Sequence, residues 1–143
     1  MKLQQLSVFL ENKPGQLKRA IDLLAQANIN ILTLSLADTK QFGILRLIIR
    51  DWARAKSVLG EAGFVANTTE VLALEVADRP GGLAELLAHI ETTGLNIEYM
   101  YAFAYARGNK AVMIFRFDNP DKAVEELKAS GVNVIGSVEL FTQ

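Results

Sequence analysis

The sequence predicts a mixed α/β (α+β) protein in which one β-α-β-β-α-β domain occurs twice. The segment Asn12–Leu17, NKPGQL, returns as Asp78–Leu83, DRPGGL, 66 residues later, and Asn30-Ile31 returns as Asn96-Ile97 at the same spacing. Around each segment the apolar pattern passes in the same order from strand to helix to paired strands. Self-similarity at a fixed spacing indicates that one small domain was duplicated.

The first copy opens with a strand and a helix. Residues 3–10 are β-prone and apolar and end at the turn cluster 12–15, which predicts a strand. Pro14 suits the first helical turn, where its missing N–H costs nothing. The helix is predicted by apolar residues at i, i+3, i+4 and i+7: Leu17, Ala20, Ile21 and Leu24.

A strand over 29–37, a turn at 39–41 and a strand over 44–49 follow. Asp51 is the predicted N-cap of a second helix, and Gly63 in the C′ position ends it. Residues 64–68 begin a fourth strand.

The second copy repeats this order, with strands over 71–76, 97–106 and 111–117 and a hairpin turn at 107–110. Its first helix carries Leu83, Leu86, Leu87 and Ile90 as an apolar stripe. Its second helix starts with the N-cap Asn119 and Pro120 at N1, and Gly131 ends it. A last strand over 132–141 closes the copy. Gly136 interrupts that strand, and 65–76 is long enough to serve either sheet.

Each copy therefore has the ferredoxin-like pattern, a four-stranded antiparallel sheet with two helices on one face. The domain limits that follow are 1–68 and 69–143. Because each half lies near the lower size limit for independent folding, we expect the copies to share an interface.

Composition excludes several classes of protein. The 15 basic and 16 acidic residues give a net charge of −1, which argues against nucleic-acid and anionic-membrane binding. The chain has no cysteine, and its one histidine, His89, cannot build a multi-His metal site. Residues 1–5 turn polar too early for a signal peptide, and no stretch reaches the ~18 apolar residues of a membrane span. We expect a soluble cytoplasmic protein without metal or cofactor.

The Pro-Gly turn has the chemistry to hold a free amino acid. A helix N-terminus offers unpaired N–H groups to a carboxylate, and glycine lets the backbone approach closely. Carboxamide and carbonyl oxygens accept from an ammonium group. Asn30, expected beside this turn, would join Asn12 in holding the zwitterion, and the Gly15–Leu17 backbone would hold its carboxylate.

The strand, the Asn/Asp-x-Pro-Gly-x-Leu turn, the helix and the Asn-Ile opening of the next strand resemble the ACT domain, and the whole chain is similar to small stand-alone tandem ACT proteins of bacteria. The resemblance implies that a regulatory amino acid binds between the turn of one domain and the second strand of its neighbour. It assigns ligand binding to two sets of residues: Asn12, Pro14, Gly15, Gln16, Leu17 and Asn30 in the first copy, and Asp78, Pro80, Gly81, Gly82, Leu83 and Asn96 in the second.

The two turns differ in one position that matters. Asp78 stands where the first copy has Asn12, and an ionised carboxylate accepts hydrogen bonds but repels the ligand carboxylate. The second copy is therefore expected to bind differently or not at all. The alternative is that Asn12 and Asp78 are ordinary helix N-caps and the Pro-Gly segments ordinary turns.

An aromatic row is the other conspicuous feature. Tyr99, Tyr101, Phe103 and Tyr105 alternate along one strand and share a face. If Leu32, Leu34 and Leu36 of the first copy pack on the helices, the row faces away from them. It is then an interface between domains or subunits, or the wall of a ligand pocket for a bulky apolar or aromatic amino acid; ordinary core packing is the third reading.

The sequence gives little support for catalysis or for RNA binding. Ser7 and Ser35 have no neighbouring histidine to act as a base, and His89 is expected on the surface. Residues 107–112 only loosely match an RNA-binding strand. We expect a non-catalytic, allosteric module that binds a free amino acid at an interdomain or intersubunit cleft, as a homodimer. The alternative is a ligandless dimerisation module that docks on a metabolic enzyme.

Overall fold

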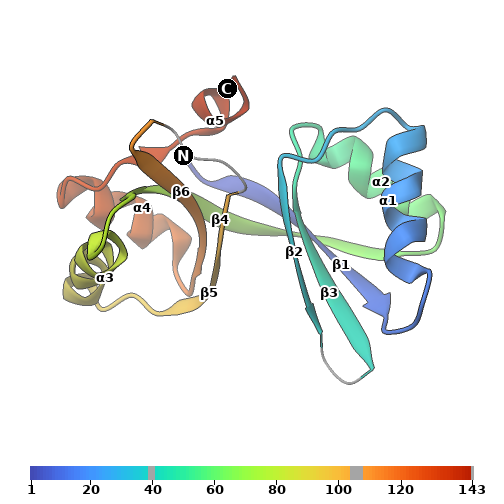
Figure 1. The fold of residues 1–143 in the computed structure, drawn as a ribbon, viewed down its shortest axis with the longest axis horizontal. Helices are drawn as coiled ribbons and strands as arrows, with labels where there is room; N and C mark the ends of the chain where they lie inside the picture. Colours follow the sequence, from blue (N-terminus) through green and yellow to red (C-terminus); the bar gives the residue numbers. More distant parts are fainter. Residues whose placement is uncertain (39–40, 104–107, 143) are drawn as a thin grey trace. The chain divides into compact units, whose positions relative to one another are not determined.

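The computed structural model describes residues 1–38, 41–103 and 108–142, and the chain divides into two compact units (Figure 1). The first unit is Gln4–Thr69. The second unit is Glu70–Gln143 together with the N-terminal residues Met1–Leu3. Both have the βαββαβ order of a ferredoxin-like domain with antiparallel sheets, which confirms the predicted fold class.

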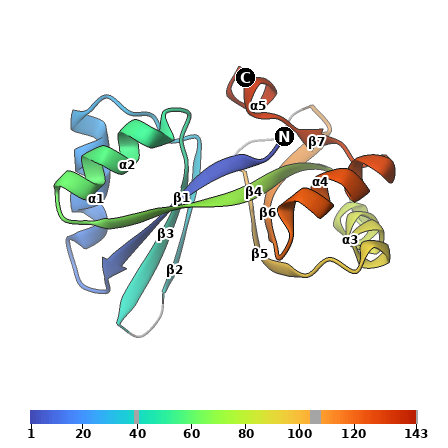
Figure 2. The same ribbon diagram turned by 180° about the vertical axis from the view of Figure 1, so that it is seen from behind.

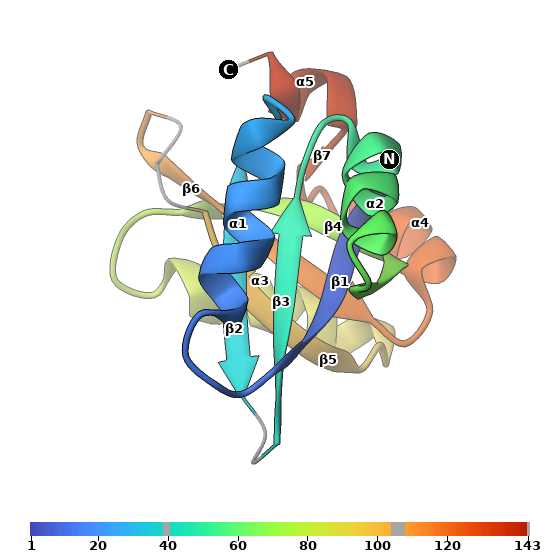
Figure 3. The ribbon, with the colours of Figure 1, turned by 90° about the vertical axis from the view of Figure 1, so that its right-hand side faces the viewer.

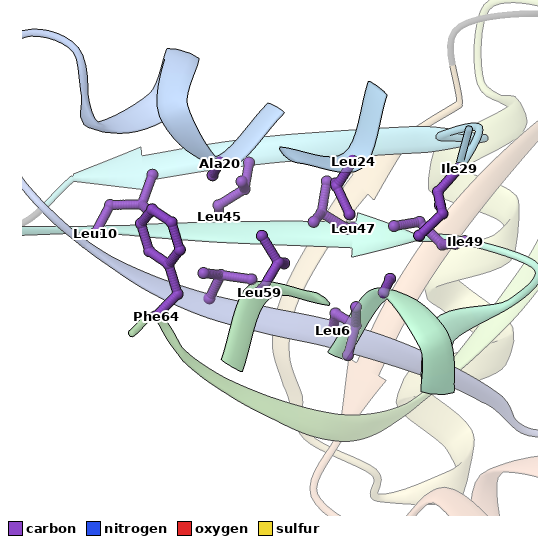
Figure 4. Close-up of a cluster of buried hydrophobic side chains, with 12 residues drawn as sticks. Leu6, Leu10, Ala20, Leu24, Ile29, Leu45, Leu47, Ile49, Leu59 and Phe64 are labelled. Carbon is purple, nitrogen blue, oxygen red and sulfur yellow. The ribbon is translucent and has the colours of Figure 1, made fainter. Parts of the chain in front are cut away.

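The first unit is a four-stranded sheet in the order β2-β3-β1-β4, with both helices on one face (Figure 3). Its elements are β1 Leu3–Glu11, α1 Gln16–Gln26, β2 Thr33–Asp38, β3 Phe42–Ile48, α2 Trp52–Glu61 and the start of β4 Val65–Ala77. The core lies between sheet and helices, where Ala20 and Leu24 of α1 meet Leu45 and Leu47 of β3 and Leu59 of α2 (Figure 4).

The second unit continues β4 and adds six further elements, which Figure 2 shows from behind. They are α3 Gly82–Thr93, β5 Ile97–Ala102, β6 Lys110–Phe117, α4 Pro120–Ala129 and β7 Val134–Ile135, followed by the short helix α5 Ser137–Phe141. β4 pairs with β6 on one side and with β7 on the other, and β6 pairs with β5. The stacked rings of Phe115 and Phe117, 5.6 Å between centroids, form the centre of the helix-facing core.

The two helix N-caps predicted at Asp51 and Asn119 are confirmed, and in both the side chain accepts a backbone hydrogen bond. The carboxylate of Asp51 accepts from the backbone N–H of Arg54 at 3.3 Å, at the start of α2. The carboxamide oxygen of Asn119 accepts from the N–H of Lys122 at 3.1 Å, with Pro120 opening α4. Gly63 and Gly131, at φ +92° and +82°, stand just beyond the ends of α2 and α4 as expected.

Several predicted boundaries were wrong. Pro14 lies in the turn before α1 rather than in its first helical turn, because Gly15 is the N-cap. The second strand begins at Thr33, not at Ile29, which packs into the core below the end of α1. The segments 64–68 and 71–76 are one continuous strand of 13 residues, because β4 serves both units.

The C-terminal segment was also predicted wrongly. Of residues 132–141, only Val134–Ile135 is a strand, and 137–141 form α5. The change comes at Gly136, and Leu140 is the side chain of α5 that is buried. Of the turn predicted at 39–41, residues 39 and 40 lie outside the described residues, as do 104–107 of the predicted strand and turn in the second copy.

The leucines of β2 do not pack on the helices as supposed. Leu34 and Leu36 are opposite the core residues Leu47 and Leu45 of β3, so they stand on the helix-facing side of the sheet. Their side chains are nevertheless 45% and 49% exposed. The reason is that β2 is the edge strand of this unit and pairs with β3 on one side only.

The aromatic row stands on the face predicted for it. Tyr101 is opposite Ile114 of β6, whereas Met100 is opposite the core residue Phe115, so Tyr101 points away from the helices. Tyr99, Tyr101 and Phe103 are half-buried, and Tyr105 lies outside the described residues. Ile114 is fully buried on the same face.

No helix within the described ranges has the length and hydropathy that crossing a bilayer requires. The same part of the chain holds no group of three or more His, Cys, Asp or Glu side chains placed to bind a metal ion.

Candidate functional site

The two Pro-Gly turns have the same backbone hydrogen bonds. In the first unit the N–H of Asn12 donates to Gln41 O at 2.9 Å, and that of Arg19 donates to Gly15 O at 3.0 Å. In the second unit Asp78 donates to Asn109 O at 3.1 Å, and Glu85 donates to Gly81 O at 2.9 Å. The repeat seen in the sequence is therefore a repeat of local geometry.

Both helices begin at a left-handed glycine, which explains the Pro-Gly dipeptide. Gly15 and Gly81 are the N-caps of α1 and α3, with φ of +90° and +87°, a conformation that favours residues without a Cβ. Neither helix receives a side-chain cap. The alternative in which Asn12 and Asp78 act as ordinary N-caps is therefore wrong, and the N-cap residue gives neither first turn a side-chain acceptor.

The second turn is tighter and carries different charges. The N–H of Gly82 lies 3.0 Å from Arg79 O, whereas that of Gln16 lies 3.4 Å from Lys13 O. Arg79 pairs with Glu85 of α3, its Nη2 being 2.8 Å from both carboxylate oxygens. In the first unit the pair is local instead, with Lys13 Nζ 3.1 Å from Glu11.

A small hollow of about 80 Å³ lies beside the first turn. The end of β1, Asn12, Lys13, Leu17 of α1, and Leu36 and Gly43 of the two neighbouring strands line it. Leu17 and Leu36 supply an apolar wall, and Asn12 supplies a carboxamide that is exposed to solvent. Asn12 and Leu17 were predicted as site residues from the sequence, whereas Leu36 was not. The signal that Leu36 offered was a large apolar residue near the end of an edge strand.

Asn30 does not lie beside this turn, and the expectation that it would was wrong. Gly43 of β3 is opposite both Leu10 and Asp38, so the end of β2 lies at the turn. The start of β2 is opposite Ile48, five residues further along β3, which is about 17 Å at strand spacing. Asn12 and Asn30 therefore stand at opposite ends of the unit, and one small ligand cannot contact both in the same copy.

Asn96 has the same position in the second unit and has a local role. Its N–H donates to the carboxylate of Asp118 at 3.1 Å, and its carbonyl accepts from the N–H of Asp118 at 3.1 Å. Pro80 and Leu83 are exposed in the turn, whereas Gly82 is buried against Ala77.

Comparison with known proteins shows which family the chain belongs to. A family model described as an ACT domain pair matches residues 1–142. Protein BT0572 from Bacteroides thetaiotaomicron, a crystal structure, is 38% identical with a TM-score of 0.91, covering 100% of this chain and 98% of that one. No curated protein matches the sequence.

More distant structures share the fold alone. The ligand-free regulatory subunit of aspartate kinase from Thermus thermophilus is 18% identical with a TM-score of 0.64, covering 90% of each chain. Aspartokinase III from E. coli, solved with lysine and aspartate, is 16% identical with a TM-score of 0.54, covering 90% of this chain and 30% of that one.

Proposed function

This chain belongs to the family of ACT domain pairs, and from that premise we propose that it is a non-catalytic regulatory module that binds a free amino acid. The observation that carries the proposal is the first turn, where a helix N-terminus without a side-chain cap borders a hollow lined by a carboxamide and three leucines. The N–H groups of such a terminus suit a carboxylate, and Asn12 has an oxygen for an ammonium group.

The hollow at the first turn is open, so a ligand there needs a second wall. We propose that another ACT copy provides it, from this chain or from a second chain, by bringing its Asn30 or Asn96 end toward the turn. This arrangement is the one that the ACT resemblance implies, and it removes the conflict with the separation of Asn12 and Asn30 inside one copy. The exposed Leu34 and Leu36 support an assembly at this edge.

The second turn is proposed to bind more weakly. Asp78 replaces the carboxamide with a group that repels a ligand carboxylate, and Glu85 adds a second negative charge in the first turn of α3. Tyr99, Tyr101 and Phe103 stay candidates for a pocket wall or an interface. Binding would act on a partner, such as a metabolic enzyme, only through a difference in affinity between two arrangements of the ACT copies.

The proposal is tested by titrating the full chain with each of the twenty standard amino acids in a calorimeter and in thermal unfolding. A ligand at 100 times its dissociation constant should stabilise the chain by about 2.7 kcal/mol. Asn12→Ala should abolish the response without lowering the unligated melting temperature. Gln26→Ala, which removes an exposed carboxamide at the other end of α1, is the matched control and should bind normally.

A response that survives Asn12→Ala unchanged would place the ligand elsewhere. Silence with every amino acid would instead favour the second candidate, a ligandless module that associates through the exposed Leu34 and Leu36 edge. Sedimentation of the chain without ligand measures that association directly.

A further inference from the structure

We infer that the second unit holds a separate site for a basic amino acid, in a hollow between α3 and the segment that follows α4. This inference goes beyond the site proposed at the first turn and uses none of its side chains. The two units of the duplicated chain differ in the side chains that occupy this groove.

The hollow has a volume of about 350 Å³, within the roughly 300–1,000 Å³ range of small-molecule sites. The apolar side chains Val76, Leu86 and Val132 contribute to its lining, together with Glu85 and His89 of α3. Gly131 and Asn133, in the segment after α4, also line it, as does Lys110 of β6.

The corresponding groove of the first unit is filled by its own side chains. The guanidinium of Arg19 lies 4.6 Å from the ring centroid of Phe64. Its Nη2 also donates to Ala62 O, at the C-terminal end of α2, at 2.6 Å. A cation with an apolar stem thus occupies this place in the first unit, held by a helix C-terminus and an aromatic ring.

The second unit lacks both of these side chains. Glu85 takes the place of Arg19, since the two make the same bond to the preceding N-cap glycine. Val132 takes the place of Phe64, since each donates to a leucine carbonyl of the preceding helix, at Leu127 and Leu59. The groove is therefore emptied, and its charge is reversed from positive to negative.

An acceptor without a donor lies beside the emptied groove. Ser130 O, next to the lining residue Gly131, is the counterpart of Ala62 O at the negative end of α4, and no donor to it is found among the described residues. Together with the Glu85 carboxylate it favours a cation. Val76, Leu86 and Val132 suit an alkyl stem, and the ammonium of Lys110 suits a carboxylate. A free basic amino acid, above all one with a guanidinium, combines these three features.

Arg79 shows that Glu85 accepts a guanidinium. Its Nη2 lies 2.8 Å from both oxygens of Glu85. Both side chains are more than half exposed, and exposed pairs of this kind contribute little, so a ligand can displace Arg79. The guanidinium of the ligand would then bind the Glu85 carboxylate. It would have the position that the Arg19 side chain has in the first unit.

The test is a calorimetric and NMR titration of the full chain with L-arginine, L-citrulline and agmatine. We expect L-arginine to bind and to shift the amide signals of Gly82, His89 and Gly131. L-citrulline, which keeps the shape without the charge, should bind at least about tenfold more weakly. Agmatine, which lacks the carboxylate, should also bind more weakly because it cannot engage Lys110.

Three variants and one control locate the site. Glu85→Gln should weaken L-arginine binding about tenfold, whereas Arg79→Ala should tighten it by freeing the carboxylate. The double variant Glu85→Arg with Val132→Phe rebuilds the plug of the first unit and should abolish binding. Glu91→Gln makes the same charge change on an exposed position of α3 outside the hollow and should have no effect.

The inference is overturned if L-arginine does not bind, if citrulline binds equally well, or if binding survives the rebuilt plug. Signal shifts confined to Asn12–Leu17 would also overturn it, while supporting the function proposed for the first turn. If L-arginine still binds the Asn12→Ala variant with unchanged affinity, the two sites are independent.

Discussion

The carbonyl oxygen of Ala77 closes over Gly82 so tightly that a Cβ on Gly82 would lie 1.9 Å from it. Gly82 opens α3 and has no left-handed backbone, so close approach rather than backbone angle requires glycine here. We predict that Gly82→Ala destabilises the second unit by at least about 1–3 kcal/mol, since the carbonyl of the adjacent strand must shift. Urea unfolding followed by circular dichroism measures this loss.

Gly60 is the matched control for that substitution. It lies inside α2, has no left-handed backbone, and a Cβ there would meet nothing within 4 Å. Gly60→Ala should therefore stabilise the chain by up to about 0.5–1 kcal/mol. Equal effects of the two substitutions would show that the turn before α3 is looser than the structure has it.

The cap of α2 supports a second prediction. Asp51→Ala removes the oxygen that accepts from the N–H of Arg54 and should cost about 0.5–2 kcal/mol. Asp51→Asn keeps an acceptor and should cost much less. The midpoint of urea unfolding, compared between the two variants, separates the cap from the change of charge.

The ion pairs of Lys2 lead us to expect that the stability of the folded chain falls as the pH rises in the alkaline range. Its ammonium lies 2.8 Å from Asp121 and 2.8 Å from Glu70, and these hydrogen bonds, Asp121 first, raise the pKa of Lys2 above its ordinary value of 10.5. Because the folded pKa is the higher one, this contribution is complete below pH 10.5 and is lost as the pH rises through the folded pKa.

The Lys2→Met variant should therefore lose less stability than the parent when the pH is raised above 10.5. Lys122→Met, on the exposed side of α4, is the control for the general effect of lysine titration. Parallel pH curves of stability for Lys2→Met and the parent would contradict the assigned role.

The edge strand β2 supports a prediction about assembly. Leu36→Glu places a charge on a side chain that is 49% exposed, so the free energy of unfolding of the isolated chain should change by less than about 0.5 kcal/mol. If this edge joins another ACT copy of a second chain, the variant should sediment as a lighter species than the parent. Val138→Glu, at a 79% exposed apolar residue of α5, should leave sedimentation unchanged.

Patterns within one copy predicted much of the fold. The apolar stripe of Leu17, Ala20, Ile21 and Leu24 predicted α1, and Asp51 and Asn119 marked the starts of two helices. These features act between residues close in sequence, through helix periodicity and local hydrogen bonds. The duplicated turn was readable for the same reason, since its left-handed glycine is a local requirement.

Patterns that depend on distant partners were misjudged. Residues 137–141 suit a strand as well as a helix, and the interruption noted at Gly136 did not say that a helix follows it. The position of Asn30 was misplaced because a helix between two parallel strands returns the chain to the opposite end of the sheet, a feature of topology rather than of composition.

The amino-acid sequence by itself determined that one βαββαβ unit occurs twice and that each copy has a Pro-Gly turn before its first helix. Hydrophobic periodicity and backbone restriction are properties of short segments, so both features can be read locally. Only the tertiary structure decided that Leu36 joins the first turn while Asn30 does not. It also decided that Arg19 and Phe64 fill a groove which Glu85 and Val132 leave open. Those relationships depend on which strand ends and helix faces meet in space, and side chains far apart in the chain acquire a common environment only when the sheet and its helices pack together.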